Sequence, residues 1–496
     1  MMKAQFFGRA YIRGFSTLEM LIAVSVLLLG MTAALLMQFG AQAAAVDAQI
    51  QMQALARAAS VLDRARVVAA QDVVGVIATS SVWSVGGQTY VQTISVAHKT
   101  QCRTQATSSV FWQNSPVRPQ RVELSRVFID IERMLSLGRD CITDVSPWEG
   151  LHARSVNTID AGVPTALDVL NGLVYGGGTA SPYFFILDTT TSADKSANEL
   201  VSFENGFNAG AAINALDATA LRSHEGVLRH YVFAAMEATT SQMTVIDVTS
   251  PKKPTTVAVR TLNNVSPVGS EPAGHRLYYF ADRLYVLTRY TAGPELHTFD
   301  VSNPEDPVEL GGGVELGVTV NGIAVQERFI EGVSRRFAYL ATSQAAGELK
   351  VYDVTDPLRV GAATEVLEAR QDLPGIQNGL SVYPLGNRLY VGRASTPPGA
   401  DLYVYDTTNP PQGLALVGGH DIGTGVETVL VVGDFAFLST PKSKKELQVW
   451  DIRSDPIALV AEYALPGSVA GGLEYEDGFL FVTAQSDASV HTFVGY

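Results

Sequence analysis

The sequence predicts an α+β protein of several domains, with one long N-terminal helix and a small β region ahead of a large all-β body. Three observations predict this class. An apolar segment covers residues 21–37, a short phrase with a central aspartate recurs through the second half of the chain, and glycine is frequent, with 44 residues. At 496 residues the chain exceeds the length at which a single hydrophobic core stops growing, so two or more folded units are expected.

The charge is strongly acidic. There are 35 Lys and Arg against 49 Asp and Glu, a formal net charge of −14, and no run of basic residues. Such a body repels phosphate backbones. We therefore expect no nucleic-acid partner.

The N-terminal apolar segment has an unusual start. A stretch with basic residues ends at Gly14, Phe15 follows, and a single acid, Glu19, lies just inside the apolar run, which Ala-rich sequence extends to Val46. As a helix this run is long enough to cross a hydrocarbon core of about 30 Å. A carboxylate in a bilayer needs a partner. A free α-amino group at Phe15, made by cutting after Gly14, would supply one in a packed array of such helices.

Gly14, Phe15 and Glu19 resemble the processing motif of type IV prepilins and type II secretion pseudopilins. The resemblance implies cleavage after Gly14 and N-methylation of Phe15 by a prepilin peptidase. It also implies that Glu19 serves assembly with other pilin subunits through the N-terminal helix. The alternative is an uncleaved membrane anchor with a chance Glu. No Pro occurs before Pro116, whereas many major pilins carry a helix-kinking Pro, which favours a minor pilin or a pseudopilin.

Beyond the apolar run the helix pattern continues before a small β region begins. Residues 48–70 keep strong helix formers with apolar residues at helical spacing, and Gly75 offers a stop. Residues 82–96, with Gly86 and Gly87 in the middle, predict a hairpin. Residues 121–135 fit either a strand or a helix. We expect a compact pilin-type cap on the upper helix.

The chain has two cysteines, Cys102 and Cys141. In an exported protein such a pair favours a disulfide. Closing the loop between them would stabilise the fold by about 4 kcal/mol in the chain-entropy model. The alternative is two independent buried thiols.

A phrase of apolar residues, Asp, a small polar turn and Pro recurs in the second half of the chain. Clear copies cover residues 245–251, 298–304, 351–357, 404–410 and 449–456, with a weaker copy at 186–188 and a decayed one at 491–494. Its aspartates are Asp188, Asp247, Asp300, Asp353, Asp406 and Asp451. The carboxylate can accept N–H bonds from the turn that follows, and Pro presets φ for the next strand. We interpret these aspartates as structural turn residues.

Another apolar strand precedes each phrase, which gives four short strands per repeat. This periodicity predicts a β-propeller, most simply with seven blades, with six or eight as the alternatives. Residues 149–165 align without gaps to residues 412–428, an outer strand that leads into the next blade. Residues 152–159 are therefore expected to pair with the last blade and close the ring. The phrase resembles the LVIVD-type propeller repeat, a bacterial surface and exported module.

The predicted domains are thus a prepilin leader at 1–14, a transmembrane spine helix at 15–75, a small pilin-like β region at 76–146 and a propeller at 147–496. No catalytic motif, phosphate loop or metal-ligand spacing is present, and the eight histidines are scattered. We expect no catalytic residues, no metal, no cofactor and no enzymatic activity. A small ligand would bind at the channel mouth that Gly-rich connections such as 466–472 surround.

The leading hypothesis is a minor type IV pilin-like protein, located at the filament tip, whose propeller is an extracellular adhesion head. It would reside in the cytoplasmic membrane before assembly and at the cell surface afterwards, and its target would be a surface, protein or glycan. The alternatives are a type II secretion pseudopilin and a membrane-anchored periplasmic propeller enzyme, since propeller enzymes gather their residues across blades.

Overall fold

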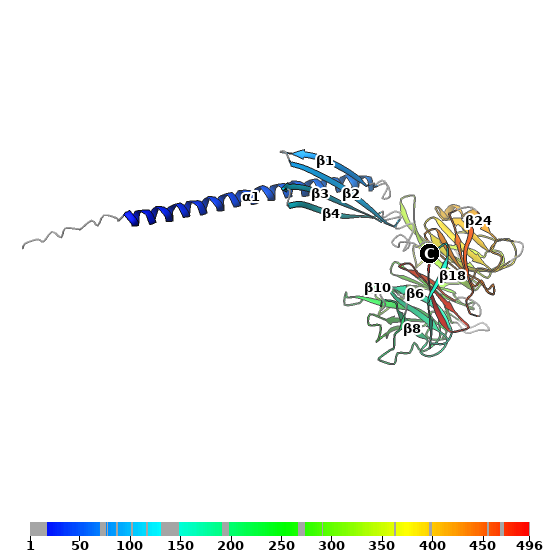
Figure 1. Ribbon diagram of the computed structural model, residues 1–496. Helices are drawn as coiled ribbons and strands as arrows, with labels where there is room; N and C mark the ends of the chain where they lie inside the picture. Colours follow the sequence, from blue (N-terminus) through cyan, green and yellow to red (C-terminus); the bar gives the residue numbers. More distant parts are fainter. Residues whose placement is uncertain are drawn as a thin grey trace, which may run out of the picture. The chain divides into compact units, whose positions relative to one another are not determined.

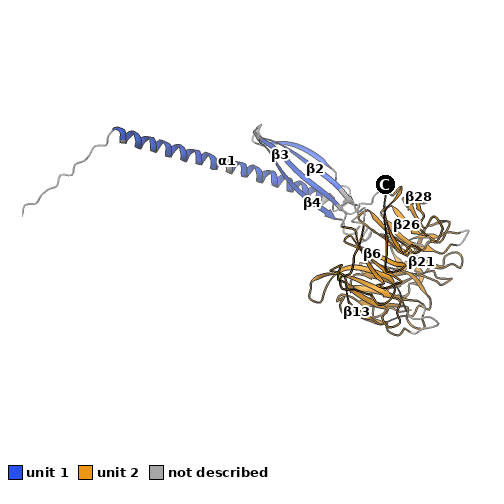
Figure 2. Ribbon diagram, turned by 60° about the horizontal axis from the view of Figure 1, so that its bottom comes forward, with its two compact units in different colours: residues 1–130 blue, residues 131–496 orange. Residues whose placement is uncertain are grey.

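The structure, a computed structural model, divides the chain into two compact units, Met1–Asp130 and Ile131–Tyr496 (Figure 2). It describes residues 17–69, 76, 78–85, 88–100, 103–115, 118–129, 148–190, 198–265, 273–289, 291–361, 364–395, 399–453, 456–466 and 471–495. The domain boundaries expected after residues 14, 75 and 146 all fall outside the described residues and stay predictions.

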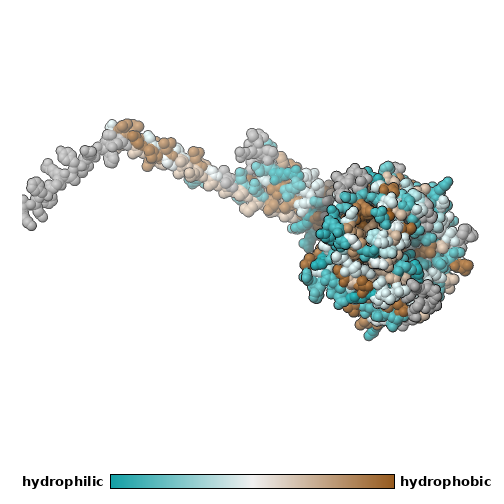
Figure 3. Space-filling view, turned by 90° about the horizontal axis from the view of Figure 1, so that it is seen from below, coloured by the Kyte–Doolittle hydropathy of each residue, from teal (hydrophilic) through white to brown (hydrophobic). Residues whose placement is uncertain are grey.

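Unit 1 begins with a single continuous helix, α1, which spans Thr17–Ala69 (Figure 1). Its N-terminal half is apolar and exposed, as with Leu27 at 64% and Leu36 at 72%. Brown apolar atoms mark this part of the helix in Figure 3. By length and composition α1 can cross a membrane, so it can act as a membrane anchor or as a signal sequence.

The C-terminal half of α1 packs on a four-stranded antiparallel sheet. The strands are β1 (Thr79–Val85), β2 (Gln88–Thr100), β3 (Arg103–Ser115) and β4 (Arg118–Ile129), in the order β1-β2-β3-β4. The predicted hairpin is β1–β2, and the ambiguous segment is a strand up to Ile129. On α1 the contact face is built from small residues, and the buried ones are Ala54, Ala58, Leu62, Ala65 and Ala69. Small side chains let the helix axis lie close to the sheet.

The described residues of unit 2 form seven small antiparallel sheets, consistent with an all-β propeller-like body. The first sheet contains β6 (Pro164–Leu170), β7 (Leu173–Gly178), β8 (Phe184–Asp188) and β9 (Glu199–Leu200), and the second contains β10 (Ile213–Arg222), β11 (Leu228–Met236), β12 (Met243–Asp247) and β13 (Thr255–Arg260). The third sheet contains β14 (Gly274–Phe280), β15 (Arg283–Thr288), β16 (Leu296–Asp300) and β17 (Val308–Val314), and the fourth contains β18 (Val320–Ile330), β19 (Val333–Thr342) and β20 (Leu349–Asp353). The fifth sheet contains β21 (Gly379–Leu385), β22 (Arg388–Arg393), β23 (Leu402–Asp406) and β24 (Ala415–His420), and the sixth contains β25 (Thr428–Val432), β26 (Phe435–Ser439), β27 (Leu447–Asp451) and β28 (Ala458–Tyr463). The seventh contains β29 (Leu473–Glu476), β30 (Phe479–Ala484), β31 (Ser489–Gly495) and β5 (Leu151–Thr158).

The core of unit 2 lies between neighbouring sheets. Strand residues alternate between the two faces of a sheet, so each sheet can bury apolar side chains against the sheet before it and the sheet after it. Phe233 and Phe299, for example, pack between the second and third sheets, and Phe437 and Phe493 between the sixth and seventh. A further cluster joins Phe481 of the last sheet to Leu187 of the first. Each sheet is therefore packed on both faces.

The first strand of unit 2 completes the last sheet. β5 pairs antiparallel with β31, with Leu151 opposite Gly495 and Thr158 opposite Ser489. This is the pairing that the alignment of residues 149–165 with residues 412–428 predicts. It joins the two ends of the unit within one sheet.

One sheet departs from the four-strand expectation. The sheet β18–β20 has three strands, and the described chain that follows pairs with β20 through isolated bridges at Leu349–Gln371 and Tyr352–Glu365 instead of through a regular strand. This segment contains the 3₁₀ helix Leu367–Ala369, and Arg370 bonds back to Glu365 at 2.5 Å. A local helical turn there replaces the regular ladder of a fourth strand.

Candidate functional site

The first strands of all seven sheets line one common cavity of about 230 Å³. Its lining comes from β6, β10, β14, β18, β21, β25, β29 and the residues just before them. We call this cavity the polar mouth, because charged and amide side chains face it at the N-terminal ends of the strands. Its polar lining includes Thr165, Asn214, Arg276, Asn321, Ser381, Glu427 and Thr428.

Bulged residues build the polar mouth. The register shifts by one residue near the start of several first strands, at Ile213/Ala215, Gly274/Arg276 and Val320/Gly322 for example. A bulge turns the extra side chain away from the ladder. The side-chain amide of Asn214 donates to the Gly274 carbonyl at 2.7 Å, and that of Asn321 donates to the Gly379 carbonyl at 2.7 Å. Each of these bonds joins one sheet to the next.

Three charged side chains line the polar mouth from different sheets: Arg276 of β14, Glu427 just before β25 and Glu474 of β29. Arg276 of β14 donates from Nε to the Asn321 carbonyl at 2.9 Å and from Nη1 to the His275 carbonyl at 3.0 Å. Burial lowers its pKa, and burial raises the pKa of Glu427, which the charge of Arg276 partly offsets. Neighbouring His275 has its pKa lowered to about 3 by burial and by the charges of Arg276 and Arg289.

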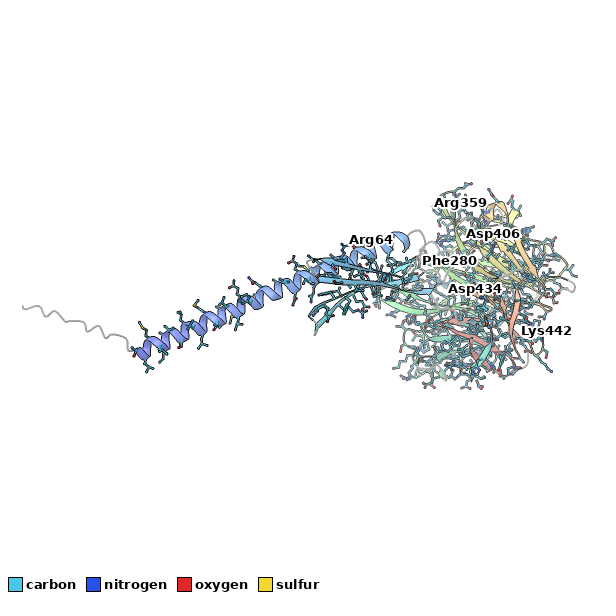
Figure 4. All side chains as sticks on the ribbon, turned by 45° about the horizontal axis from the view of Figure 1, so that its top comes forward. Arg64, Phe280, Arg359, Asp406, Asp434 and Lys442 are labelled. Atoms are coloured by element: carbon cyan, nitrogen blue, oxygen red, sulfur yellow. The ribbon has the colours of Figure 1, made fainter. Side chains whose placement is uncertain are left out.

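A second cavity of about 440 Å³ lies towards the C-terminal ends of the first strands. It shares Leu216, Leu277, Val382 and Glu474 with the polar mouth. We call it the aromatic mouth, since its lining adds Asp168, Asp217, Tyr278, Tyr279, Phe280 and Tyr383; Phe280 is labelled in Figure 4. Asp168 accepts from the Ala218 N–H at 2.5 Å and Asp217 from the Tyr279 N–H at 3.0 Å, so both carboxylates join adjacent sheets.

The six predicted turn aspartates each end the third strand of their own sheet. In every case Oδ1 accepts from the backbone N–H two residues on, at 2.7 to 3.0 Å. The carboxylates are those of Asp188, Asp247, Asp300, Asp353, Asp406 and Asp451, and Asp406 is labelled in Figure 4. Hydrogen bonds from the turn lower the pKa of Asp300 and of Asp406. Each therefore acts at its own turn, and they form no common site.

A buried anchor residue five positions before the turn aspartate escaped the sequence reasoning. Before five of the six turn aspartates this position holds Gln242, Glu295, Glu348, Asp401 or Glu446, all at most 3% exposed, whereas before Asp188 it holds the half-buried Tyr183. Each of the five accepts a backbone N–H from the segment that crosses to the next sheet, at Leu262, Leu316, Leu373, Ile422 and Leu465 respectively. These anchors fix the connections that enter the polar mouth. The spacing of 53 residues from Gln242 to Glu295, Glu348 and Asp401 was the signal that could have found them.

The predicted processing residues Gly14 and Phe15, and both cysteines of the predicted disulfide, Cys102 and Cys141, lie outside the described residues. The backbone of Glu19 belongs to α1. Their roles stay predictions. Residues 467–470 of the Gly-rich connection are also outside the described residues, whereas Gly471 and Gly472 line the polar mouth as expected.

The histidines at equivalent repeat positions, His297 and His491, are both buried in the sheets. His297 contacts Glu309 at 2.7 Å and the Pro294 carbonyl at 3.0 Å. Within the part of the chain that the structure describes, no group of three or more His, Cys, Asp or Glu side chains is placed to hold a metal ion.

No protein-family model matches the sequence, and no curated protein matches it either. Among solved structures, a chain of the mitotic checkpoint complex is 12% identical, with a TM-score of 0.48 over 71% of this chain and 97% of that one. U3-55K is 11% identical, with a TM-score of 0.41 over 69% and 99% of the two chains. Sqt1 of Saccharomyces cerevisiae is 10% identical, with a TM-score of 0.43 over 71% and 89%. At these identities the likeness carries nothing about function.

Proposed function

We propose that this protein is a minor type IV pilin-like subunit, placed at the filament tip, whose unit 2 is a closed seven-bladed propeller and an extracellular binding head. One observation carries the proposal. α1 is a single 53-residue helix whose N-terminal half is apolar and exposed and whose C-terminal half forms a core with a four-stranded sheet. A membrane-embedded shaft joined to a small sheet is what a pilin spine and cap require, and the residues before α1 carry the processing motif.

Three features support the propeller head. Seven sheets follow one another in sequence, their first strands line one cavity, and β5 completes the last sheet. A ring closed in this way leaves no unpaired sheet edge at its ends. Unit 2 is much larger than unit 1, which favours sparse incorporation at a tip over a place in every turn of a tight filament.

The test is mass spectrometry of the N-terminus of the protein from its native envelope, with and without prepilin peptidase. The expected mature chain begins at N-methylated Phe15 only when the peptidase is present. A Glu19→Gln variant separates two steps, because it keeps the residues at the cut and removes the charge proposed for assembly. It is expected to be cut normally and to be lost from purified filaments.

An intact leader under both conditions would refute the pilin assignment. A processed chain that co-purifies with a secretion complex and never with surface filaments would replace the tip pilin with the pseudopilin.

A further inference from the structure

The guanidinium group of Arg276 lines the polar mouth, and only part of this group is hydrogen-bonded to the protein. Arg276 donates one hydrogen from Nε and one from Nη1 to backbone carbonyls, which fixes the plane of the guanidinium group. Its Nη2 donates to no described residue, and no described carboxylate lies within ion-pair distance. Guanidinium groups bind carboxylates through two parallel N–H donors. The edge of Arg276 formed by Nη1 and Nη2 still has one such pair of donors free for a ligand.

Glu427 supplies the opposite charge on the same cavity. It immediately precedes β25, three sheets away from Arg276 on β14, and its carboxylate accepts no hydrogen bond from a described residue. Its oxygens are not fully buried, so a molecule in the cavity can reach them. Burial nevertheless raises the pKa of this carboxyl group. A half-buried carboxylate without a donor is costly, and a ligand that donates hydrogen bonds to it would recover that cost.

The polar mouth also carries the hydroxyl groups of Thr165, Ser381 and Thr428, the carboxylate of Glu474 and two asparagines, which present acceptors to it. Asn214 donates both amide hydrogens, to Glu237 at 2.6 Å and to Gly274, and Asn321 donates both of its own, to Ser343 at 3.1 Å and to Gly379. Their carbonyl oxygens are then the groups left for a ligand. None of the described residues that line this cavity carries an aromatic ring, which removes the stacking surface that sugar rings use.

We propose that the polar mouth binds a small α-amino acid, with the carboxylate of the ligand on Arg276 and its ammonium group directed to Glu427. The cavity of about 230 Å³ has room for a ligand of this size. The inference deepens the binding role of unit 2 and rests on the function proposed above. The anchors and inter-sheet bonds hold the site, so it exists before the ligand arrives.

Binding is tested by titration calorimetry and thermal unfolding of the full-length protein in detergent. L-alanine carries both charges, whereas ethylamine and propionate of similar size carry one each. Saturable binding of L-alanine is expected, with ethylamine and propionate at least tenfold weaker, because each loses one charged hydrogen-bonding group. Equal binding of propionate or ethylamine, or no binding of L-alanine up to about 10 mM, which corresponds to an interaction too weak to be specific, overturns the proposal.

Two substitutions locate the site. Arg276→Gln and Glu427→Gln are each expected to weaken L-alanine binding at least tenfold, whereas the exposed Arg359→Gln and Glu331→Gln make the same changes elsewhere and leave it unaltered. If Arg276→Gln fails to fold, Glu427→Gln still decides the matter, since that carboxylate has no bond to lose. Undiminished binding by Glu427→Gln refutes the site. If the chain is cut after Gly14 but does not bind L-alanine, only this inference is refuted. If the chain binds L-alanine but keeps its leader, only the pilin assignment is refuted.

Discussion

His275 lies where its protonation is opposed by burial and by two positive charges. Burial is the largest cause, and Arg276 and Arg289 add to it, so the pKa of the imidazole falls from 6.5 to about 3. Its Nδ1 is buried without a hydrogen-bond partner. In the unfolded chain the same imidazole regains an ordinary pKa. The folded state therefore excludes a proton that the unfolded state binds.

A pH dependence of stability follows from this difference. Between pH 6.5 and pH 3 the unfolded chain binds a proton at His275 that the folded chain does not, so the free energy of unfolding falls as the pH falls. The contribution is about 1.4 kcal/mol per pH unit at most. A His275→Gln variant should show a shallower slope than the parent over this range in urea unfolding of the full-length protein. A His224→Gln variant at an exposed loop position is the control, and equal slopes for His275→Gln and the parent would contradict the assignment.

At the scale of elements, the close approach of α1 to its sheet depends on alanines. Ala58 is fully buried against a cluster that contains Tyr90, Val110 and Trp112, whereas Ala56, two residues earlier, faces outward. An ion pair from Arg126 of β4 to Asp63 of α1 at 2.6 Å adds a surface contact, which contributes little. Packing of small residues is therefore the main link between helix and sheet.

Ala58→Leu should loosen this packing and Ala56→Leu should not. The added side chain at position 58 has no space, and overpacking of this kind costs about 1–3 kcal/mol. Faster amide hydrogen exchange is expected in β2 and β3 of Ala58→Leu, measured by mass spectrometry of the full-length protein. The two variants add the same atoms to the same helix. If both exchange alike, then the buried alanine face is not what holds the sheet.

At the scale of the whole molecule, unit 2 depends on contacts between residues that are far apart in the sequence. Every sheet is packed between two others, and the last and first sheets share the cluster of Phe481 and Leu187. The pairing of β5 with β31 adds a ladder between the two ends of the unit. Loss of this ladder would expose the edges of two strands, while the apolar cluster between the last and first sheets would remain.

A covalent bond across this ladder should stabilise the whole unit. Ser155 and Thr492 are directly opposed in β5 and β31, so a Ser155→Cys, Thr492→Cys pair, made with Cys102 and Cys141 replaced by serine, should form a disulfide on oxidation. Closing so long a loop should add about 4 kcal/mol or more in the chain-entropy model. The unfolding midpoint of the oxidised protein should rise and return to the parent value on reduction. Failure to oxidise would mean that the two strands are not paired in this register.

Features that depend on local chemistry were predictable from the sequence. The turn aspartates mark the ends of β8, β12, β16, β20, β23 and β27, because an Asp that accepts the N–H two residues on needs only its own turn. The closing strand was also predictable, since residues 149–165 repeat the pattern of an outer strand elsewhere in the chain. The missing fourth strand after β20 was not, because the repeat phrase before it, ending at Asp353, is regular.

The polar mouth was predictable in place but not in chemistry. Its glycines and its position at the strand entries follow from the repeat. The pair of Arg276 and Glu427 does not, since each stands in a different repeat and neither position is shared by the others. The buried anchors were missed because their residue type changes among Gln, Glu and Asp while their role stays the same.

The strand that completes the last sheet has a mechanical consequence. Unit 2 includes residues from Ile131 onward, and its first strand, β5, begins at Leu151, three residues after the buried Trp148. A pull on the chain before β5 is therefore carried by the packing of Trp148 and by the hydrogen bonds between β5 and β31. If unit 2 is the binding head proposed above, the force at which this packing and this ladder rupture would limit the load that it can bear.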